Sequence, residues 1–116
     1  MYRRGMTRPP AVVDVFSAIG HPRRRDLVDA LARKDQRVSE LVDELGLAQS
    51  TVSEHLGVLR SVGLVDSMKH GREQIYSLNP VPLREVSVWV SRLKVFWAER
   101  HQRLAILLEA IDEKEE

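Results

Sequence analysis

The fold is decided by residues 38–76, VSELVDELGLAQSTVSEHLGVLRSVGLVDSMKHGREQIY. Two sets of apolar residues recur in this stretch at the spacing of a helix face: Leu41, Val42 and Leu45, then Val52, Leu56 and Leu59. Gly46 lies between the two sets, where a turn lets two helices cross steeply, and Gly63 marks the end of the second helix. The stretch therefore predicts a helix, a turn and a second helix.

A hairpin with a polar tip is predicted directly after the second helix. Its candidate strands are Leu64–Met68 and Glu73–Leu78, which flank the tetrapeptide Lys-His-Gly-Arg. Gly71 supplies the positive φ that a tight turn requires. Lys69 and Arg72 flank this glycine and suit a phosphate backbone or a minor groove, although a merely solvated turn is the competing interpretation.

In this order the elements predict a helix-turn-helix followed by a β-wing, which places the second helix in the major groove of DNA. The apolar positions of that helix face the first helix and leave short hydrogen-bonding side chains for base edges and phosphates. The expected DNA-binding residues are Gln49, Ser50, Thr51, Ser53, Glu54, His55, Arg60, Lys69 and Arg72. Leucines at helical spacing also form ordinary cores, but the glycine turn, the polar first turn and the hairpin together argue against that alternative.

Two further helices are predicted before this stretch. Apolar residues at i, i+4 and i+7 indicate a first helix that ends at Gly20: Val12, Phe16 and Ile19. Pro22 suits the first position of the next helix, which runs to about Lys34. Ser39 is expected to cap the third helix. The predicted fold class is therefore mainly α with a small β-hairpin wing, a winged helix-turn-helix.

The longest predicted helix covers about residues 83–111. At ~1.5 Å per residue its length exceeds ~40 Å, too long for so small a domain to cover. Its aromatic stripe indicates an interface with a second copy of the chain. The expected dimer-interface residues are Phe16, Trp89, Leu93, Phe96, Trp97, Leu104 and Leu107. A membrane-surface helix is the weaker alternative, because Glu85, Glu99 and Glu109 share the polar face with the cations.

Composition indicates one intracellular domain. The 116 residues suit a single modest core, and no apolar run exceeds the five residues Leu104–Leu108, so neither a signal peptide nor a membrane span is expected. The chain has no cysteine, which excludes disulfides, thiol catalysis and metal binding through sulfur. We expect a cytoplasmic protein with no membrane partner.

Charge is unevenly distributed along the chain although the net charge is only +1. Arginines gather in the first quarter and carboxylates at the end: Arg3, Arg4, Arg8, Arg23, Arg24 and Arg25 against Glu109, Asp112, Glu113, Glu115 and Glu116. Residues 1–10 are expected to be a flexible basic arm. Residues 11–112 then form the winged domain with its dimerisation helix, and residues 113–116 an acidic tail.

Thr51–Val65, TVSEHLGVLRSVGLV, resembles the "TVSxHLxxLxxxGLV" stretch of ArsR/SmtB-type winged-helix regulators. In that family a "DPxR" motif precedes the second helix. Residues 21–24 match this motif, with His21 in place of the usual Asp and Arg24 at the position of the Arg. Gly71-Arg72 and Tyr76–Leu78 look like its wing. The resemblance covers about residues 11–112 and implies a dimeric, DNA-binding transcription regulator.

Two departures from the family pattern bear on DNA affinity. The residue before the recognition helix, often Ser in the family, is Ala48, so the side-chain cap is lost. Glu54 stands where relatives often carry Arg or another non-acidic residue. Its carboxylate repels phosphate but can accept a hydrogen bond from a cytosine amino group.

The metal sites of the family are not matched. Its metal sensors often carry Cys-Val-Cys in the third helix, where this chain has Arg37, Val38 and Ser39. Its other site needs paired ligands on C-terminal helices, but here His101 is followed three residues later by Leu104, and a lone imidazole does not hold a transition metal tightly. We expect no metal site, no cofactor and no metal response, while an effector of unknown chemistry is left open.

No catalytic constellation accompanies the motif. Ser53 and His55 are two residues apart on one helix, so they do not face each other as a nucleophile and its base would. The sequence favours a sequence-specific regulator, with repression as the expected mode, that binds an inverted-repeat operator as a homodimer. The alternatives are a winged-helix protein-interaction module without specific DNA binding and, more distantly, an enzyme.

Overall fold

The computed structural model describes residues 13–115, with side chains up to residue 112. Contacts within the chain divide it into a first unit that ends at Leu83 and a second unit that begins at Arg84. The expected basic arm of residues 1–10 lies outside the described residues.

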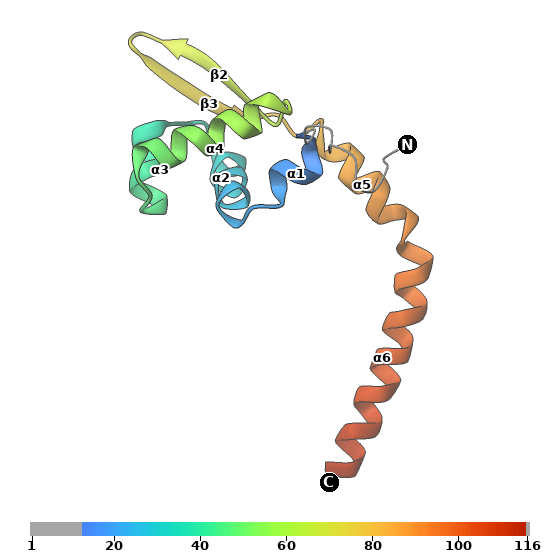
Figure 1. The fold of residues 1–116 in the computed structure, drawn as a ribbon. Helices are drawn as coiled ribbons and strands as arrows, with labels where there is room; N and C mark the ends of the chain where they lie inside the picture. Colours follow the sequence, from blue (N-terminus) through green and yellow to red (C-terminus); the bar gives the residue numbers. More distant parts are fainter. Residues whose placement is uncertain (1–12, 116) are drawn as a thin grey trace, which may run out of the picture. The chain divides into compact units, whose positions relative to one another are not determined.

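The first unit is mainly helical, as predicted. In chain order it contains α1 (Val15–Ile19), α2 (Pro22–Arg33), β1 (Gln36–Arg37), α3 (Val38–Leu45), α4 (Gln49–Ser61), β2 (Val65–His70) and β3 (Glu73–Leu78), all but β1 labelled in Figure 1. Helices α3 and α4 are the helix-turn-helix, and β2 and β3 are the hairpin that follows it. The fold is therefore a winged helix-turn-helix.

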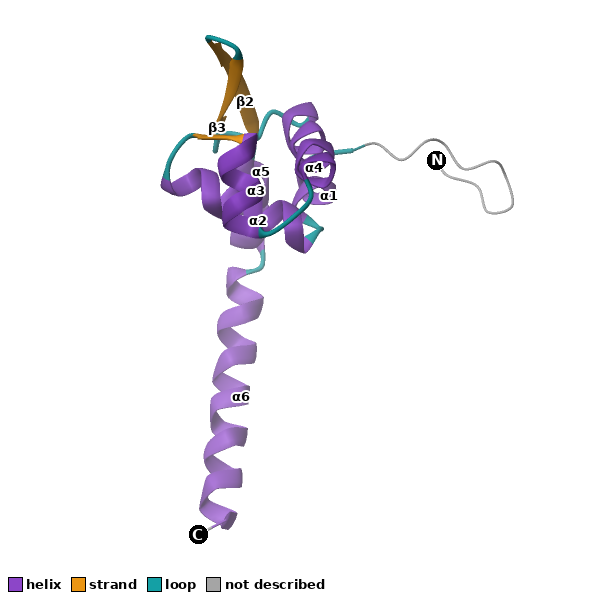
Figure 2. Ribbon diagram, turned by 90° about the vertical axis from the view of Figure 1, so that its left-hand side faces the viewer, coloured by secondary structure: helices purple, strands orange, loops and turns teal. Residues whose placement is uncertain are grey.

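The wing is a three-stranded antiparallel sheet with the strand order β1-β3-β2. Strands β2 and β3 pair along their full lengths (Figure 2). They turn at Gly71, whose φ of 66° confirms the predicted positive value. Strand β1 joins the other edge of β3, with Gln36 opposite Tyr76 and Arg37 opposite Ile75. The sequence did not predict β1, because a strand of two residues is too short to show an alternating pattern.

The core of the first unit lies where α4 packs against α1, α2 and α3. Val52, Leu56 and Leu59 of α4 are at most 1% exposed, so the apolar stripe predicted for this helix is confirmed. The surrounding elements supply the other buried apolar residues: Val15, Ala18, Leu27, Ala30, Leu31, Leu41, Leu64 and Val65. Burying each large aliphatic side chain contributes about 1.5–3 kcal/mol, and this apolar contact holds α4 in place.

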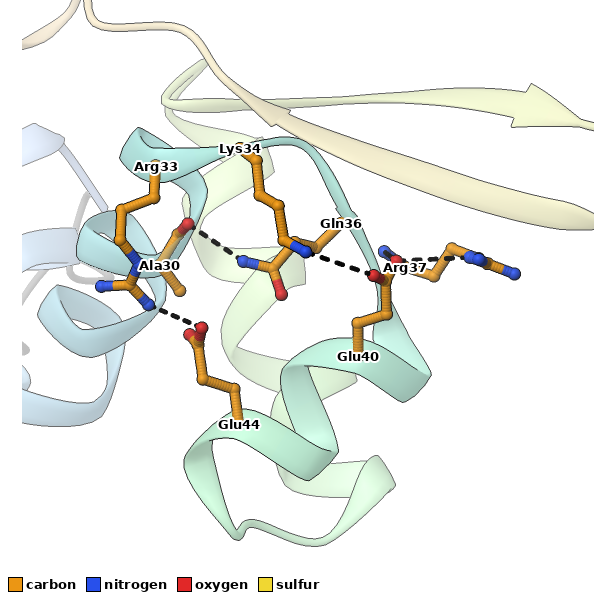
Figure 3. A network of polar contacts seen from close by, with 7 residues as sticks. All are labelled: Ala30, Arg33, Lys34, Gln36, Arg37, Glu40 and Glu44. Carbon is orange, nitrogen blue, oxygen red and sulfur yellow. Dashed lines mark hydrogen bonds and ion pairs between the residues drawn. The ribbon is translucent and has the colours of Figure 1, made fainter.

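Polar contacts join the end of α2 to α3 (Figure 3). The side chain of Gln36 is buried, and its Nε2 donates a hydrogen bond of 3.0 Å to the carbonyl of Ala30. On the surface, Arg33 pairs with Glu44 at 2.6 Å, a contact of small energy because both side chains remain partly in water. The hydrogen bond of the buried Gln36 side chain is the more important of the two, since leaving that amide unpaired would cost about 1–3 kcal/mol.

The starts of α2 and α3 differ in how they are capped. Pro22 occupies the first turn of α2 as predicted, and the Nδ1 atom of His21 accepts from the backbone N–H of Arg23 at 3.0 Å. The prediction that Ser39 caps α3 is wrong. Because that helix begins at Val38, Ser39 is already inside it, and the backbone N–H of Arg37 donates to Glu40 at 3.0 Å.

The second unit corrects the expected single helix over residues 83–111. Helix α5 (Leu83–Arg92) and helix α6 (Lys94–Glu115) are separated at Leu93. The N–H of Leu93 donates to the carbonyl of Val90, three residues back, which tightens the chain there. The apolar periodicity continues across Leu93, so it carries no sign of this break.

Helix α6 also continues into the segment expected to be an acidic tail, since its backbone is helical through Glu115. No helix within residues 13–115 combines the length and the apolar character needed to cross a membrane.

Two glycines provide a matched test of the helix-turn-helix. A Cβ atom would meet nothing within 4 Å at either Gly46 or Gly57, but Gly46 ends α3 with φ of 66° whereas Gly57 lies inside α4. Gly46→Ala should lower the free energy of unfolding by about 1–2 kcal/mol, because an L-residue is strained in the left-handed region. Gly57→Ala should raise it by about 0.5–1 kcal/mol. Urea denaturation measures both, and shifts of the same sign would contradict this assignment.

Candidate nucleic-acid interface

The exposed face of α4 is polar. Opposite the buried stripe, the helix presents Gln49, Ser50, Ser53, Glu54, Gly57 and Arg60 to solvent. Thr51 lies at the border of this face and is half-buried. Amides, hydroxyls and a guanidinium at these positions can donate to and accept from base edges, and Gly57 leaves room for close approach of another molecule.

The N-terminus of α4 is uncapped by any side chain. Ala48 holds the N-cap position with extended backbone angles, and its methyl group forms no hydrogen bond, as the sequence predicted. The N–H groups of the first turn are left as donors at the positive end of the helix dipole. Together with the hydroxyl of Ser50, they can serve phosphate oxygens.

His55 lies apart from the other expected DNA-binding residues of α4. Its ring is half-buried and faces the first unit's interior, with its centroid 4.5 Å from that of the His21 ring. The Nη1 atom of Arg24 lies 3.5 Å from His55 Nδ1. Burial, followed by the nearby His21 and Arg24, lowers the pKa of His55, while Glu54 acts in the opposite direction.

Arg24 joins three elements of the first unit. Beside its contact with His55, its Nε donates to the carbonyl of Ala18 at 2.5 Å and its Nη2 to that of Ser17 at 3.2 Å, both in α1. The sequence matched Arg24 and His21 to a family motif but gave them no partner, because residues 31 positions apart in the chain meet only in the fold. This cluster is the part of the site that sequence analysis missed.

The tip of the wing carries cations without ion pairs. Within residues 13–115, Lys69 and Arg72 form no salt bridge, and both are exposed. The neighbouring carboxylate of Glu73 is paired with Arg37 at 2.7 Å, which reduces its repulsion of a phosphate backbone. The wing can therefore contact an anionic polymer at its tip.

Arg37 connects the wing to the start of α3. Its guanidinium contacts both Glu73 on β3 and Glu40 on α3, and the hydrogen bond to Glu73 is the main cause of its raised pKa. The pKa of Glu40 is lowered, first because its carboxylate accepts the backbone N–H of Arg37. Arg37 thus forms ion pairs at a position where metal sensors of the resembled family often carry a cysteine ligand.

Within the described part of the chain, no group of three or more histidines and carboxylates lies together in a way that could hold a metal ion.

The expected dimer-interface residues occupy both units. On α5 and α6, Trp89, Phe96, Trp97, Leu104 and Leu107 are exposed in the single chain. Leu93 at the helix break and Phe16 in α1 are half-buried. Apolar exposure on this scale is concentrated in the second unit.

Comparison with known proteins decides the family. A family model described as bacterial regulatory protein, arsR family, matches residues 21–67. An HTH-type transcriptional regulator of Mycobacterium tuberculosis is 34% identical over 95 residues, which cover 81% of this chain and 82% of that regulator. The chain belongs to the ArsR family.

Two further relatives agree with this membership. The transcriptional repressor SdpR of Bacillus subtilis is 27% identical to the ArsR-family chain over 77 residues, covering 66% of the chain and 86% of SdpR. An ArsR-like transcriptional regulator from Rhodococcus sp. RHA1 matches in structure with a TM-score of 0.62 and 30% identity, over 78% of this chain and 85% of that one. This ArsR-family protein is a DNA-binding transcriptional regulator and not an enzyme.

Proposed function

We propose that this ArsR-family protein is a sequence-specific repressor that binds an inverted-repeat operator as a homodimer and does not respond to metals. The observation that carries the proposal is the two-sided character of α4, buried and apolar on one face, exposed and polar on the other. A helix held in this way by its apolar face can enter a major groove without losing core contacts. Repression is favoured because the similar protein SdpR is a repressor.

The contacts with DNA divide into two physical kinds. Gln49, Ser50, Thr51, Ser53, Glu54 and Arg60 of α4 are the proposed groove residues, since their polar groups suit base edges and adjacent phosphates. Lys69 and Arg72 of the wing are proposed to contact phosphates, which attract cations regardless of base sequence.

The second unit is proposed to form the homodimer. Helix α6 has 22 residues and is about 33 Å long at ~1.5 Å per residue. Phe96, Trp97 and Leu104 leave about half of their surface in water in the single chain, at 51%, 49% and 54% exposure. Burying aromatic surface of this size stabilises an interface, and a second copy of the chain offers the same surface in return.

A two-fold dimer accounts for the form of the proposed operator. Two copies of α4 related by a two-fold axis read the same bases on opposite strands, which makes the site an inverted repeat. Recognition helices of such dimers enter major grooves about one helical turn apart, near 34 Å.

One variant tests the proposed groove contacts and another tests the proposed phosphate contacts. Ser53→Ala should reduce the preference for operator over scrambled DNA, by about 1–3 kcal/mol per half-site if Ser53 reads a base. Arg72→Ala should weaken binding to both DNAs alike and lower the salt slope by about one per lost phosphate contact. Binding is measured across a salt series, with the operator selected by the wild-type protein from a random-sequence library.

Either of two results would contradict this division. If Arg72→Ala changes discrimination and Ser53→Ala does not, the wing reads the sequence instead of α4. If no duplex is selected and binding lacks salt dependence, the protein is an interaction module without specific DNA binding.

Dimerisation is tested with two substitutions on opposite sides of α6. Trp97→Asp should give monomer, because it places a charge in the apolar interface. Val95→Asp should leave the dimer intact, since Val95 lies two residues away on the other side of the helix and is 82% exposed. Sedimentation equilibrium measures both, and a Trp97→Asp protein that remains fully dimeric would exclude this interface.

Metal independence is tested on operator binding by the wild-type protein. The affinity should be the same in the presence of a chelator as with added zinc, cobalt or nickel, because cysteine is missing and His101 has no paired ligand on its helix. Stoichiometric binding of one of these metals, accompanied by release of DNA, would show that a metal site exists.

A further inference from the structure

Two histidines and an arginine meet beneath the recognition helix of the first unit. His55 projects from α4, Arg24 from α2, and His21 from the N-cap of α2. The tilted rings of His21 and His55 lie 4.5 Å apart at an interplanar angle of 47°, and Arg24 Nη1 is 3.5 Å from His55 Nδ1. The cluster therefore joins α4 to the start of α2 by polar contact, beside the apolar stripe.

The chemistry of this contact requires a neutral His55 ring. A guanidinium only donates hydrogen bonds, so the Nδ1 atom facing it must carry a lone pair and the ring proton must lie on Nε2. Protonation of the ring would place an N–H opposite the N–H of Arg24 and a second positive charge 3.5 Å from it. The Nδ1 atom of His21 also accepts a hydrogen bond, from the backbone N–H of Arg23.

Carboxylates around the cluster are directed elsewhere. Asp14 of α1 accepts the backbone N–H of Ser17, and Asp26 of α2 pairs with Arg23. The guanidinium of Arg25 donates to the carbonyl of Ile19. Glu54, on α4 itself, is exposed and is the carboxylate that favours a charged His55. Arg24 is therefore the cation in contact with His55, and Glu54 is the carboxylate that opposes its effect.

We propose that Arg24 is a positioning residue that holds the recognition helix through the neutral ring of His55, so that protonation of this ring releases the helix and weakens operator binding. The guanidinium of Arg24 also donates to the carbonyls of Ala18 and Ser17 in α1, and these hydrogen bonds hold it in position beside His55. In this role His55 supports α4 from its inner flank and does not read bases. The inference rests on the proposed reading of DNA by α4.

The direction of the pH effect follows from the lowered pKa of His55. Because the unfolded chain binds the proton more readily than the folded one, the contribution of the cluster to stability is fully present above the unfolded pKa of about 6.5. It decreases as the pH falls below that value toward the pKa of the folded protein. Operator affinity should decrease at lower pH, where His55 of the folded, unbound protein takes up its proton.

The experiment compares the full chain with His55→Asn and with the matched control His70→Asn, on the exposed wing. Between pH 7.5 and 5.5, wild-type affinity for the duplex it selects at pH 7.5 should fall relative to His55→Asn, by up to about tenfold for each pH unit below the pKa of His55 in the unbound protein. His70→Asn should show the wild-type fall. Arg24→Gln should weaken binding at pH 7.5 and reduce the fall, whereas Arg24→Lys, which keeps the charge, should retain it.

Urea unfolding of the same proteins without DNA is the second readout. Wild type should lose stability on acidification relative to His55→Asn, which reports on the cluster even if no sequence-specific duplex is obtained. Equal pH dependence of unfolding in these two proteins would overturn the proposal. A changed base preference in His55→Asn would also overturn it, because His55 would then read bases. Absence of any preferred duplex, with the unfolding difference present, would reject the DNA-reading function and not the cluster.

Discussion

Burial of the apolar stripe of α4 is the constraint on which the rest of the first unit depends. Val52, Leu56 and Leu59 are removed from water by three other helices, and no alternative rotation of α4 would bury them together. The rotation decides which residues face outward, so the polar face of the site follows from the core. An exposed row of short side chains could not hold a helix by itself, because surface polar contacts contribute little free energy.

Apolar burial and polar contact have different tasks in this fold. Burial is strong but has little directionality, so it selects a face of the helix and not its fine placement. Hydrogen bonds have strict geometry, and here they act at the flanks of the core, where Arg24 reaches α1 and α4 and Gln36 reaches Ala30. The two kinds of contact together fix α4 in a position from which it can enter a major groove of DNA.

The sequence was sufficient for several elements whose pattern is local, although the local cap predicted at Ser39 is wrong. The turn at Gly46, the tip at Gly71, the stripe of α4 and the uncapped Ala48 all depend on neighbouring residues, and each agrees with the structure. Features created by distant residues could not be predicted, as in the pairing of β1 with β3 and the approach of Arg24 to His55. The break at Leu93 was hidden for a different reason, since apolar spacing is the same in a straight and in an interrupted helix.

The junction at β1 has a mechanical consequence for DNA recognition. Strand β1 is continuous with the start of α3 and pairs with β3, and Arg37 adds an ion pair to Glu73 at the same place. The wing and the helix-turn-helix are therefore fastened together along β3, between Glu73 and Tyr76. On the proposed mode of binding, a duplex that contacts both must adapt its groove width and curvature to this fixed spacing. Base steps that deform easily would then be selected at positions that no side chain touches.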